Sequence, residues 1–527
     1  MNLVIDKWMH AFRQNEELST IAPWQIAETN NPVVGLAAPR ADFQGALYQF
    51  LIGLLQTAFA PQDHDEWLQY WQAPPPLDTL QEAFRCYESL FEIDNPNGAA
   101  FMQDFSLNEG EQKSIATLLI EAPGSKTRKD NLDHFVKGNS EECMCPSCAA
   151  SALFTLQVNA PSGGQGHRVG LRGGGPLTTL VLPAEAKSLW QRLWANILTQ
   201  EQLEQNSDND TTSIFPWTGP TRLSDKGGGP THPGDVHPLH MYWAMPRRMR
   251  LEFQPVDSLP CRICGEPTEI AAYHLRTKNF GYNYEGPWIH PLTPYRIDPK
   301  HKKPPLSLKG QPGGIGYRHW LGLAWQDTSN GDRAALVVQV FNEERALDLS
   351  GDTSARLWSF GYDMDNMKAR CWYESIMPLL FIPPEKRASF LDAAALLLDT
   401  AKETAALLRL YVKAAWFSRP KDAKGDMSMV DQGFWHNTES DFYRLLSQIA
   451  KQPLPEAQME PAIAKTWLAS IQREAIGQFD HWALEGDLEG LDMKRIIKAR
   501  NGLRTKLNST KSLKALKQIA TAETEAA

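Results

Sequence analysis

Residues 143–148 read CMCPSC, and residues 259–266 read LPCRICGE. Each stretch holds one C-x-x-C pair, Cys145 with Cys148 and Cys261 with Cys264. A C-x-x-C turn directs two sulfurs at one point, and four thiolates are a ligand set that zinc favours in structural sites. The sequence therefore predicts a structural Zn²⁺ site that ties together two widely separated segments.

Two alternatives to this ligand set stay open at the level of sequence. Cys143 stands two residues before Cys145 and could replace it, although the C-x-x-C spacing favours Cys145. The cysteines could also be buried or free thiols that bind no metal. A catalytic zinc is not expected, because four protein ligands leave no open position for water.

The first 120 residues mix strand-like and helical patterns. Residues 43–59 (FQGALYQFLIGLLQTAF) are apolar on most faces and predict a buried helix. Residues 203–238 are rich in Asp, Gly, Pro, Ser and Thr, which indicates an exposed connection. Residues 240–345 predict short strands and turns, with residues 337–341 (VVQVF) as the clearest strand.

The pattern becomes helical after Pro383 and Pro384. Helical spacing of apolar residues predicts four helices, at about 387–417, 438–451, 459–484 and 490–523. Four helices with short breaks between them indicate a bundle. We therefore expect an α+β fold, with a large mixed α/β N-terminal domain that carries the zinc site (1–380) and a C-terminal four-helix bundle (381–527).

The composition limits the class of protein. The formal net charge is -9, whereas a protein that binds DNA by itself is usually basic. Local basic patches, or DNA contact within an assembly, remain compatible with this charge. The sequence has no apolar run long enough for a membrane helix and no secretory-signal pattern, and its seven cysteines are odd in number. These features favour a cytoplasmic protein that has metal-bound cysteines rather than disulfides.

Two further motifs are informative only in part. Residues 159–176 (NAPSGGQGHRVGLRGGGP) are rich in glycine but match neither a Walker loop nor a dinucleotide fingerprint. They could present backbone to a nucleic acid, with Arg168 and Arg172 near phosphates, or form an ordinary loop. Residues 361–374 (GYDMDNMKARCWYE) place Asp363 close to Asp365 without metal-loop spacing, which indicates a polar loop that leads into a helix.

The order of these motifs resembles one known family. CMCPSCAASALF is followed by APSGGQGHRVGLRGG and TTLV, then by LPCRICGE and by SFGYDMDNMKARCWYE, and the chain opens with MNLVIDKWM. Over nearly its whole length this combination is similar to the CasA family, the large subunit of the type I-E CRISPR Cascade surveillance complex.

The resemblance implies a fold and a function. The fold is a large mixed α/β domain followed by a four-helix bundle. The protein would lie beside the CRISPR RNA (crRNA) and other Cascade subunits. It would recognise the protospacer-adjacent motif (PAM) in double-stranded DNA, start strand separation and R-loop formation, and help to recruit the helicase–nuclease. Its role is in antiviral defence, and the resemblance implies no catalytic activity of its own.

The resemblance also assigns residues to PAM reading. Gly163, Gly164 and Gly166 resemble the glycine loop that enters the minor groove beside the motif. Close approach of backbone explains the glycines, and minor-groove reading explains how degenerate motifs are recognised. Lys278 matches a lysine that enters the same groove. Its offset from the second cysteine pair differs by one residue, so Arg276 remains a rival.

The turn after Gly361 resembles the family's wedge, which pushes into the duplex next to the motif. The best-known form of this wedge carries a glutamine at its tip, and none is present here. Asn366 and Met367 are the expected intruding residues, Met367 as an apolar wedge and Asn366 as a polar cap on unpaired bases, with Lys368 beside them.

Two basic segments are expected to meet other nucleic acids. The segment KTRKDNLDHFVKG (126–138) resembles the loop at the crRNA handle, with Phe135 as a base-stacking residue. Its phosphate-contacting residues would be Lys126, Arg128, Lys129 and Lys137. The last predicted helix carries basic residues without intervening acidic ones, which indicates either a solvated face or a site for the displaced DNA strand. The displaced-strand residues would be Lys494, Arg495 and Lys498.

Two other functions compete with DNA recognition. A zinc-stabilised structural scaffold would need no contact with DNA. A zinc-dependent hydrolase is less favoured, because the region lacks an H-E-x-x-H or H-x-E motif. Its candidate ligands would be His232, Asp235, His237, His240 and Glu252.

Overall fold

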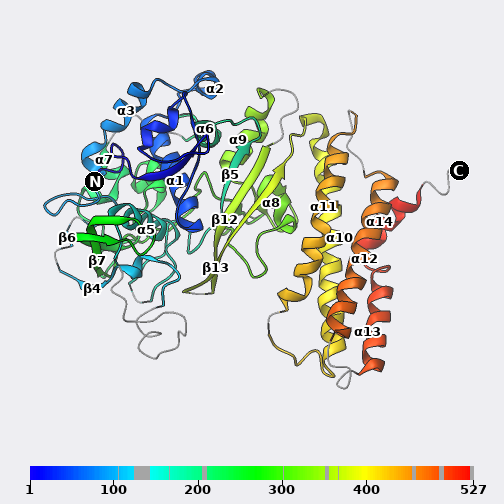
Figure 1. The fold of residues 1–527 in the computed structure, drawn as a ribbon. Coiled ribbons are helices and arrows are strands. Elements are labelled where there is room, and N and C mark those ends of the chain that lie inside the picture. The colour runs from blue at the N-terminus through cyan, green and yellow to red at the C-terminus, as the bar shows by residue number, and fades with distance from the viewer. Residues whose placement is uncertain are drawn as a thin grey trace. The chain divides into compact units, whose positions relative to one another are not determined.

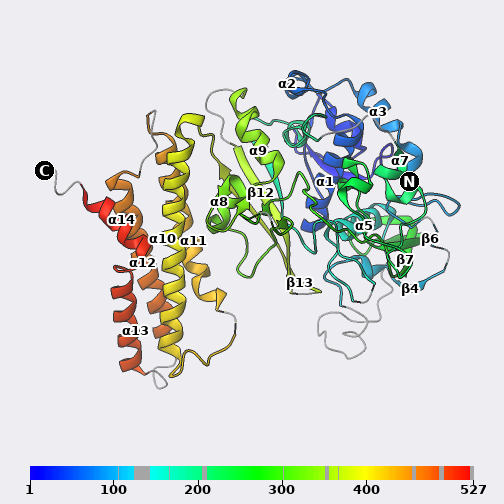
Figure 2. The ribbon, with the colours of Figure 1, turned by 180° about the vertical axis from the view of Figure 1, so that it is seen from behind.

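The computed structural model describes most of the chain (Figures 1 and 2). The described residues are 1–104, 106–107, 109–123, 143–164, 166–203, 210–300, 302–349, 355–365, 367–425, 427–453, 459–485 and 492–522. The contacts between residues divide the chain into two compact units. Unit 1 consists of Met1–Gly310, Ala334–Gly351 and Trp358–Glu374, and unit 2 of Gln311–Arg333, Asp352–Leu357 and Ser375–Ala527.

Helix α1 (Ala41–Ala58) lies in the core of unit 1 and confirms the buried helix predicted for residues 43–59. Its apolar residues face all directions, as expected of a helix that is surrounded by protein. It packs against α5 (Pro146–Asn159) and α6 (Leu189–Trp194). The ring of Phe50 makes edge-to-face contacts with the rings of Trp8, Phe91, Phe101, Phe154 and Trp243. Such aromatic contacts add specificity to the burial of apolar area.

Several small sheets surround this core. Their strands are β1 (Met9–Arg13), β2 (Leu18–Ile21), β3 (Val33–Leu36), β4 (Glu111–Ser114), β5 (Thr178–Pro183), β6 (Arg248–Pro260), β7 (Pro267–Lys278), β12 (Ala355–Asp365) and β13 (Lys368–Leu379). The strand orders are β2-β1-β3, β4-β7-β6 and β13-β12-β5. The long β6–β7 hairpin carries the second cysteine pair at its turn, and this turn determines where the cysteines meet.

The shorter elements of unit 1 complete its layers. They are α2 (His64–Gln72), α3 (Leu77–Arg85), α7 (Thr211–Ile214), α9 (Leu336–Glu343), β8 (Tyr295–Arg296) and β9 (Leu306–Ser307). With the sheets, they form the mixed α/β architecture that the sequence predicted for this part of the chain.

The strand predicted for residues 337–341 is wrong, because these residues lie in helix α9. Val337, Val338, Val340 and Phe341 are buried, and Gln339 between them is half-buried. This spacing is also that of the buried face of a helix. Tertiary packing therefore outweighs the strand preference of β-branched residues.

Residues 361–374 also differ from the prediction. They lie in the β12–β13 hairpin and do not lead from a loop into a helix. Residues 358–363 are buried in succession, as expected of a strand covered on both faces. Because the polar residues cluster at the turn, the sequence pattern resembled an exposed loop.

Unit 2 is mainly helical. Its helices are α8 (Trp320–Ala324), α10 (Pro384–Trp416), α11 (Ser428–Ala450), α12 (Pro461–Leu484), α13 (Met493–Lys506) and α14 (Lys511–Thr521), and β10 (Gln326–Asp327) pairs with β11 (Asp332–Arg333). Pro384 and Pro461 occupy the first helical turn, where a missing N–H costs little. Helix α10 contacts α11, α12, α13 and α14, and α12 also contacts α11, α13 and α14.

The long helices agree with the sequence only in part. Those predicted at 387–417 and 459–484 are found, whereas α11 begins well before residue 438. The last predicted helix is divided into α13 and α14. Asn508 and Ser509 hydrogen-bond to carbonyls of the preceding turn, and these residue types favour turns and caps. Among the described residues, every helix is too short or too polar to span a bilayer.

Candidate metal centre and nucleic-acid interface

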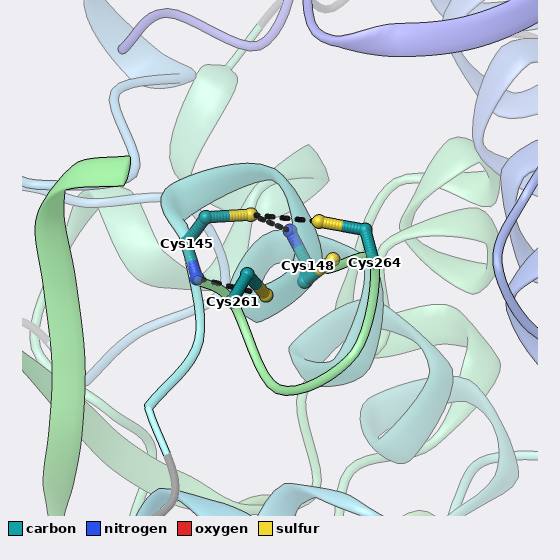
Figure 3. Close-up of side chains that lie close together, drawn as sticks. All are labelled: Cys145, Cys148, Cys261 and Cys264. Atoms are coloured by element: carbon teal, nitrogen blue, oxygen red, sulfur yellow. Dashed lines mark hydrogen bonds between the residues drawn. The ribbon is translucent and has the colours of Figure 1, made fainter. Parts of the chain in front are cut away.

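The two C-x-x-C pairs meet in unit 1 (Figure 3). Cys145 is the N-cap of α5, and its sulfur accepts a hydrogen bond from the Cys148 amide at 3.5 Å. The Cys145 amide in turn donates to the sulfur of Cys261 at 3.3 Å. The Sγ atoms of Cys145 and Cys264 lie 3.9 Å apart. The N-terminus of a helix and the turn of a hairpin thus direct four sulfurs at one point.

The geometry of the cluster fits a metal ion. The four Sγ atoms lie within 4.8 Å of one another. Hydrogen bonding to Cys145 and Cys261, burial, and repulsion from the charge of these neighbouring sulfurs raise the pKa of the Cys148 thiol. A bound cation would relieve this repulsion, and four sulfur donors suit zinc in particular. The cluster is therefore compatible with a structural metal ion.

Cys143 does not belong to this cluster, which resolves one alternative left open by the sequence. Its sulfur donates to the carbonyl of Pro260 at 3.6 Å, and its own carbonyl accepts from the Arg262 amide at 3.0 Å. Gly265 adopts a φ of 79°, and its amide closes the turn on the Cys261 carbonyl. The hairpin turn therefore uses Cys143 as a backbone anchor, while Cys145 faces the other three sulfurs.

The glycine loop lies against the end of strand β7. A Cβ on Gly166 would come 2.6 Å from Cβ of Asn279, and its carbonyl accepts from the amide of Phe280 at 2.7 Å. A Cβ on Gly163 would come 2.6 Å from the guanidinium of Arg247. Gly164 has a φ of 89° and faces open space. Packing thus requires glycine at two of these positions, and backbone conformation favours it at the third.

Lys278 stands at the end of β7, directly before the residues that touch the glycine loop. Its side chain is exposed and makes no hydrogen bond or ion pair with the described residues, while its backbone lies opposite Arg248 in the β6–β7 hairpin. Its rival Arg276 is paired with Glu252 at 2.5 Å, and Glu252 also accepts from Gln112. The structure therefore places Lys278 directly before the residues that touch Gly166, and its side chain has no ion-pair partner among the described residues, unlike Arg276.

The arginines of the glycine segment have structural contacts. Arg172 is buried and donates to Thr178, Thr293 and Gln49, so the contact with phosphate considered from the sequence is wrong. Burial lowers the pKa of Arg172 to about 10. Arg168 donates to Ser224, although its guanidinium also lies 5.9 Å from the ring centre of Phe280.

The predicted wedge is at the tip of the β12–β13 hairpin. Met367 is 53% exposed and Lys368 is exposed, whereas Asn366 lies outside the described residues. Below the tip, the guanidinium of Arg370 donates through two nitrogens to Asp363, at 3.1 and 2.7 Å. The side chain of Asp363 is only 3% exposed. No pattern in the sequence pointed to this clamp, because the pairing depends on strand register.

The structure describes only part of the two other segments that the sequence predicts to meet nucleic acids. Lys494 and Lys498 on α13 are exposed. Arg495 instead pairs with Asp492 and donates to the carbonyls of Ala415 and Trp416 at the end of α10. Arg495 therefore serves the packing of two helices. The expected handle residues Lys126, Arg128, Lys129, Phe135 and Lys137 lie outside the described residues.

The ligands considered for a zinc hydrolase do not converge. His240 is buried between the carbonyl of Ser213 and the hydroxyl of Tyr284, and burial lowers its pKa to about 4. Glu252 is paired with Arg276 on the β6–β7 hairpin. In the part of the chain that the structure describes, the four cysteines form the sole group suited to hold a metal.

Comparison with known proteins agrees with the resemblance that the motifs suggested. The model of the family described as CRISPR-associated protein Cse1 matches residues 2–477. This chain belongs to the Cse1 family, which is also called CasA, and the predicted family is confirmed.

Solved structures show the same fold. Cse1 from Thermobifida fusca matches with a TM-score of 0.71 at 16% sequence identity, over 99% of this chain and 99% of that chain. CasA from Thermus thermophilus matches with a TM-score of 0.66 at 17% identity, over 96% and 99%. A chain of a CRISPR RNA-guided surveillance complex matches with a TM-score of 0.68 at 14% identity, over 97% and 99%.

Proposed function

We propose that this chain is the large subunit of a type I-E CRISPR RNA-guided surveillance complex in the cytoplasm. It recognises the PAM in double-stranded DNA through the minor groove, starts unwinding for crRNA pairing, and helps to recruit the helicase–nuclease. It has no catalytic role of its own. Family membership supports this proposal, as does the likeness to a chain of a solved surveillance complex.

The observation that carries the proposal is the contact between the glycine loop and the end of β7. Gly166 packs on Asn279 and Phe280, which follow the exposed Lys278. A narrow groove admits backbone without side chains, and a cation is attracted by its negative potential. Minor-groove reading would thus have the bare backbone of Gly163, Gly164 and Gly166 and the cation of Lys278.

The hairpin tip would act as the wedge. Met367 offers an exposed apolar side chain, and the Arg370–Asp363 pair holds the turn that carries it. Apolar wedges unstack base steps in minor-groove complexes. Asn366 would cap an unpaired base, and Lys368 would contact a nearby phosphate. Because the usual glutamine is absent, opening of the DNA duplex would rely on Met367.

The other parts of the proposal concern the remaining nucleic acids and the domains. Lys494 and Lys498 would contact the displaced strand, and Arg495 would hold α13 against α10. The loop with Lys126, Arg128, Lys129, Phe135 and Lys137 would meet the crRNA handle. The cysteine cluster would bind structural Zn²⁺. As a division into domains, we propose 1–380 for PAM reading and 381–527 for a four-helix bundle, with α13 and α14 together as its fourth helix.

The proposal is tested by the binding of target duplexes, with and without a PAM, to the complex reconstituted with and without this chain. PAM-dependent binding and strand opening should require the chain. Lys278→Ala should lower affinity for PAM-containing duplexes by about tenfold, whereas Lys187→Ala, at another exposed lysine of unit 1, should not. Identical binding without the chain would indicate a zinc-stabilised scaffold instead.

A further inference from the structure

The outer face of the β4-β7-β6 sheet is basic beyond Lys278. Along β7, His274 and Lys278 are exposed and Arg276 is half-buried, while Leu275 and Thr277 between them are buried. Alternate residues of a strand lie on one face and are spaced by about 6.7 Å. His274, Arg276 and Lys278 therefore form a row of nitrogen-bearing side chains on the outer face.

Neighbouring strands extend this row. The register places Arg248 opposite Lys278 and Arg250 opposite Arg276. Arg250 donates to the backbone carbonyls of Asn95 and Gly98, and the nearby carboxylates of Asp94 and Asp104 offset part of its charge without forming an ion pair with it. On β4, Gln112 lies opposite Arg276 and is exposed. We call His274, Arg276, Lys278, Arg248, Arg250 and Gln112 the β7 face.

The carboxylates on this face balance only part of its charge. Asp104 pairs with Arg248 at 2.5 Å and is itself buried, and Glu252 pairs with Arg276 at 2.5 Å. Lys278 and Arg250 have no carboxylate partner within ion-pair distance among the described residues. The side chain of Arg276 is 41% exposed, so its guanidinium is accessible although it is paired. The β7 face thus keeps an excess of positive charge in a chain of net charge -9.

We propose that the β7 face binds phosphates of the DNA duplex that flanks the PAM and so fixes the position of the duplex on the glycine loop. This inference rests on the proposed function. It favours duplex DNA over RNA because the row is continuous with Lys278 and the glycine loop. Phosphate contacts set register and orientation, whereas contacts with base edges give specificity. The β7 face would therefore supply affinity that does not depend on the PAM sequence.

The test compares two PAM-containing duplexes bound by the reconstituted complex. One extends past the PAM by one helical turn, roughly 10 base pairs, and the other ends at the PAM. Arg276→Gln should weaken binding of the extended duplex by about threefold to tenfold. The slope of log affinity against log salt concentration should fall by the contribution of about one phosphate contact. Binding of the short duplex should not change.

A second variant acts in the opposite direction on the same ion pair. Glu252→Gln keeps the shape of the side chain and removes the opposing charge, so the extended duplex should bind about twofold to fivefold more tightly at low salt. Arg85→Gln is the matched control, because Arg85 is an exposed arginine paired with a glutamate elsewhere in unit 1. This control variant should change the binding of neither duplex.

The outcomes separate this inference from the proposed function. Equal losses on both duplexes, or a defect in crRNA loading, would overturn duplex binding by the β7 face and indicate RNA contact or a folding effect. Normal binding by Arg276→Gln and Glu252→Gln, alongside a loss in Lys278→Ala, would overturn the inference and leave PAM reading intact. If Lys278→Ala also binds normally, the proposed function fails with it.

Discussion

Two turns of unit 1 are held in place by different chemistry. The turn of the β6–β7 hairpin meets the N-terminus of α5 through four sulfurs, which repel one another as thiolates unless a cation joins them. The tip of the β12–β13 hairpin is held by an ion pair between Arg370 and Asp363, both supplied by the chain. If the cluster holds a metal ion, as proposed, the first turn depends on that ion, whereas the second depends only on side chains of the chain itself. Loss of the metal should therefore affect folding, and loss of the ion pair should affect one local function.

The largest effect should follow from breaking the cysteine cluster. Cys148→Ser should abolish binding of zinc and lower the free energy of unfolding by about 4 kcal/mol or more, because metal binding contributes to folding directly. Zinc content and thermal unfolding of the purified chain measure both effects. A cavity of about 310 Å³ is lined by Cys145, Cys148 and Cys264, so a chelator should reach the site and reproduce the defect.

Cys143→Ser is the matched control for this change. Its sulfur only donates to the Pro260 carbonyl, and a serine hydroxyl also donates, so the cost should be about 1 kcal/mol without loss of zinc. Full zinc content in Cys148→Ser, or loss of zinc in Cys143→Ser, would contradict the assigned ligands.

The ion pair of the second turn should give a smaller and more specific effect. Asp363→Asn removes the buried carboxylate that accepts two hydrogen bonds from the Arg370 guanidinium and should cost about 2–3 kcal/mol in unfolding free energy. Strand opening, followed by fluorescence of a base analogue beside the PAM, should slow, while PAM binding stays normal. Asp365→Asn is the control, because Asp365 is 61% exposed and lies 3.9 Å from Arg370. Equal effects of the two variants would count against the clamp.

Among the described residues, the glycine loop is held by neither a metal nor an ion pair, but by close packing and a backbone hydrogen bond to Phe280. Gly166→Ala combines a φ of 78° with a Cβ 2.6 Å from Asn279, and should cost about 1–2 kcal/mol together with most PAM binding. Gly164→Ala has the same kind of backbone strain but no neighbour within 4 Å, so its stability loss should be about 1 kcal/mol. Thermal unfolding and duplex binding distinguish the two variants. If Gly164→Ala loses more stability than Gly166→Ala, the packing argument is wrong.

The smallest effects are expected on α13. Arg495→Gln removes hydrogen bonds to the end of α10 and should cost about 1 kcal/mol of stability. Lys498→Gln should change stability by less than about 0.5 kcal/mol but reduce the salt dependence of R-loop stability. Denaturant unfolding measures the stability, and R-loop lifetimes over a range of salt concentrations measure the contact with DNA. If Arg495 were the residue that contacts DNA, Arg495→Gln rather than Lys498→Gln would reduce the salt dependence.

The sequence predicted features that depend on local spacing. The C-x-x-C pairs identified the four cysteines that cluster in the structure, because a two-residue gap itself directs both sulfurs at one point. Helix α1 was predictable because a long apolar run needs protein on all sides. Pro383 and Pro384 marked the start of the helical region, and α10 begins at Pro384, since proline is tolerated in the first helical turn.

Features that depend on tertiary contacts were not predictable in this way. The contacts of a basic side chain depend on residues that are far away in the sequence. The sequence pattern therefore assigned Arg172 and Arg495 to phosphates, although each serves packing within the protein. The VVQVF segment fits either a strand or a helix face, and only its neighbours decide. The Arg370–Asp363 pair requires knowledge of strand register, which a polar turn does not reveal.

Because the two cysteine pairs are far apart in the sequence, the ribosome makes the first pair well before the second. Cys145 and Cys261 are 116 residues apart in the chain. At about 5–20 residues per second, a ribosome takes roughly 6–23 seconds to translate that interval. During this time Cys145 and Cys148 have emerged without their partners, and their thiols are open to oxidation or to capture of a foreign metal. The cell's reducing capacity and its supply of free zinc would therefore govern the yield of native protein.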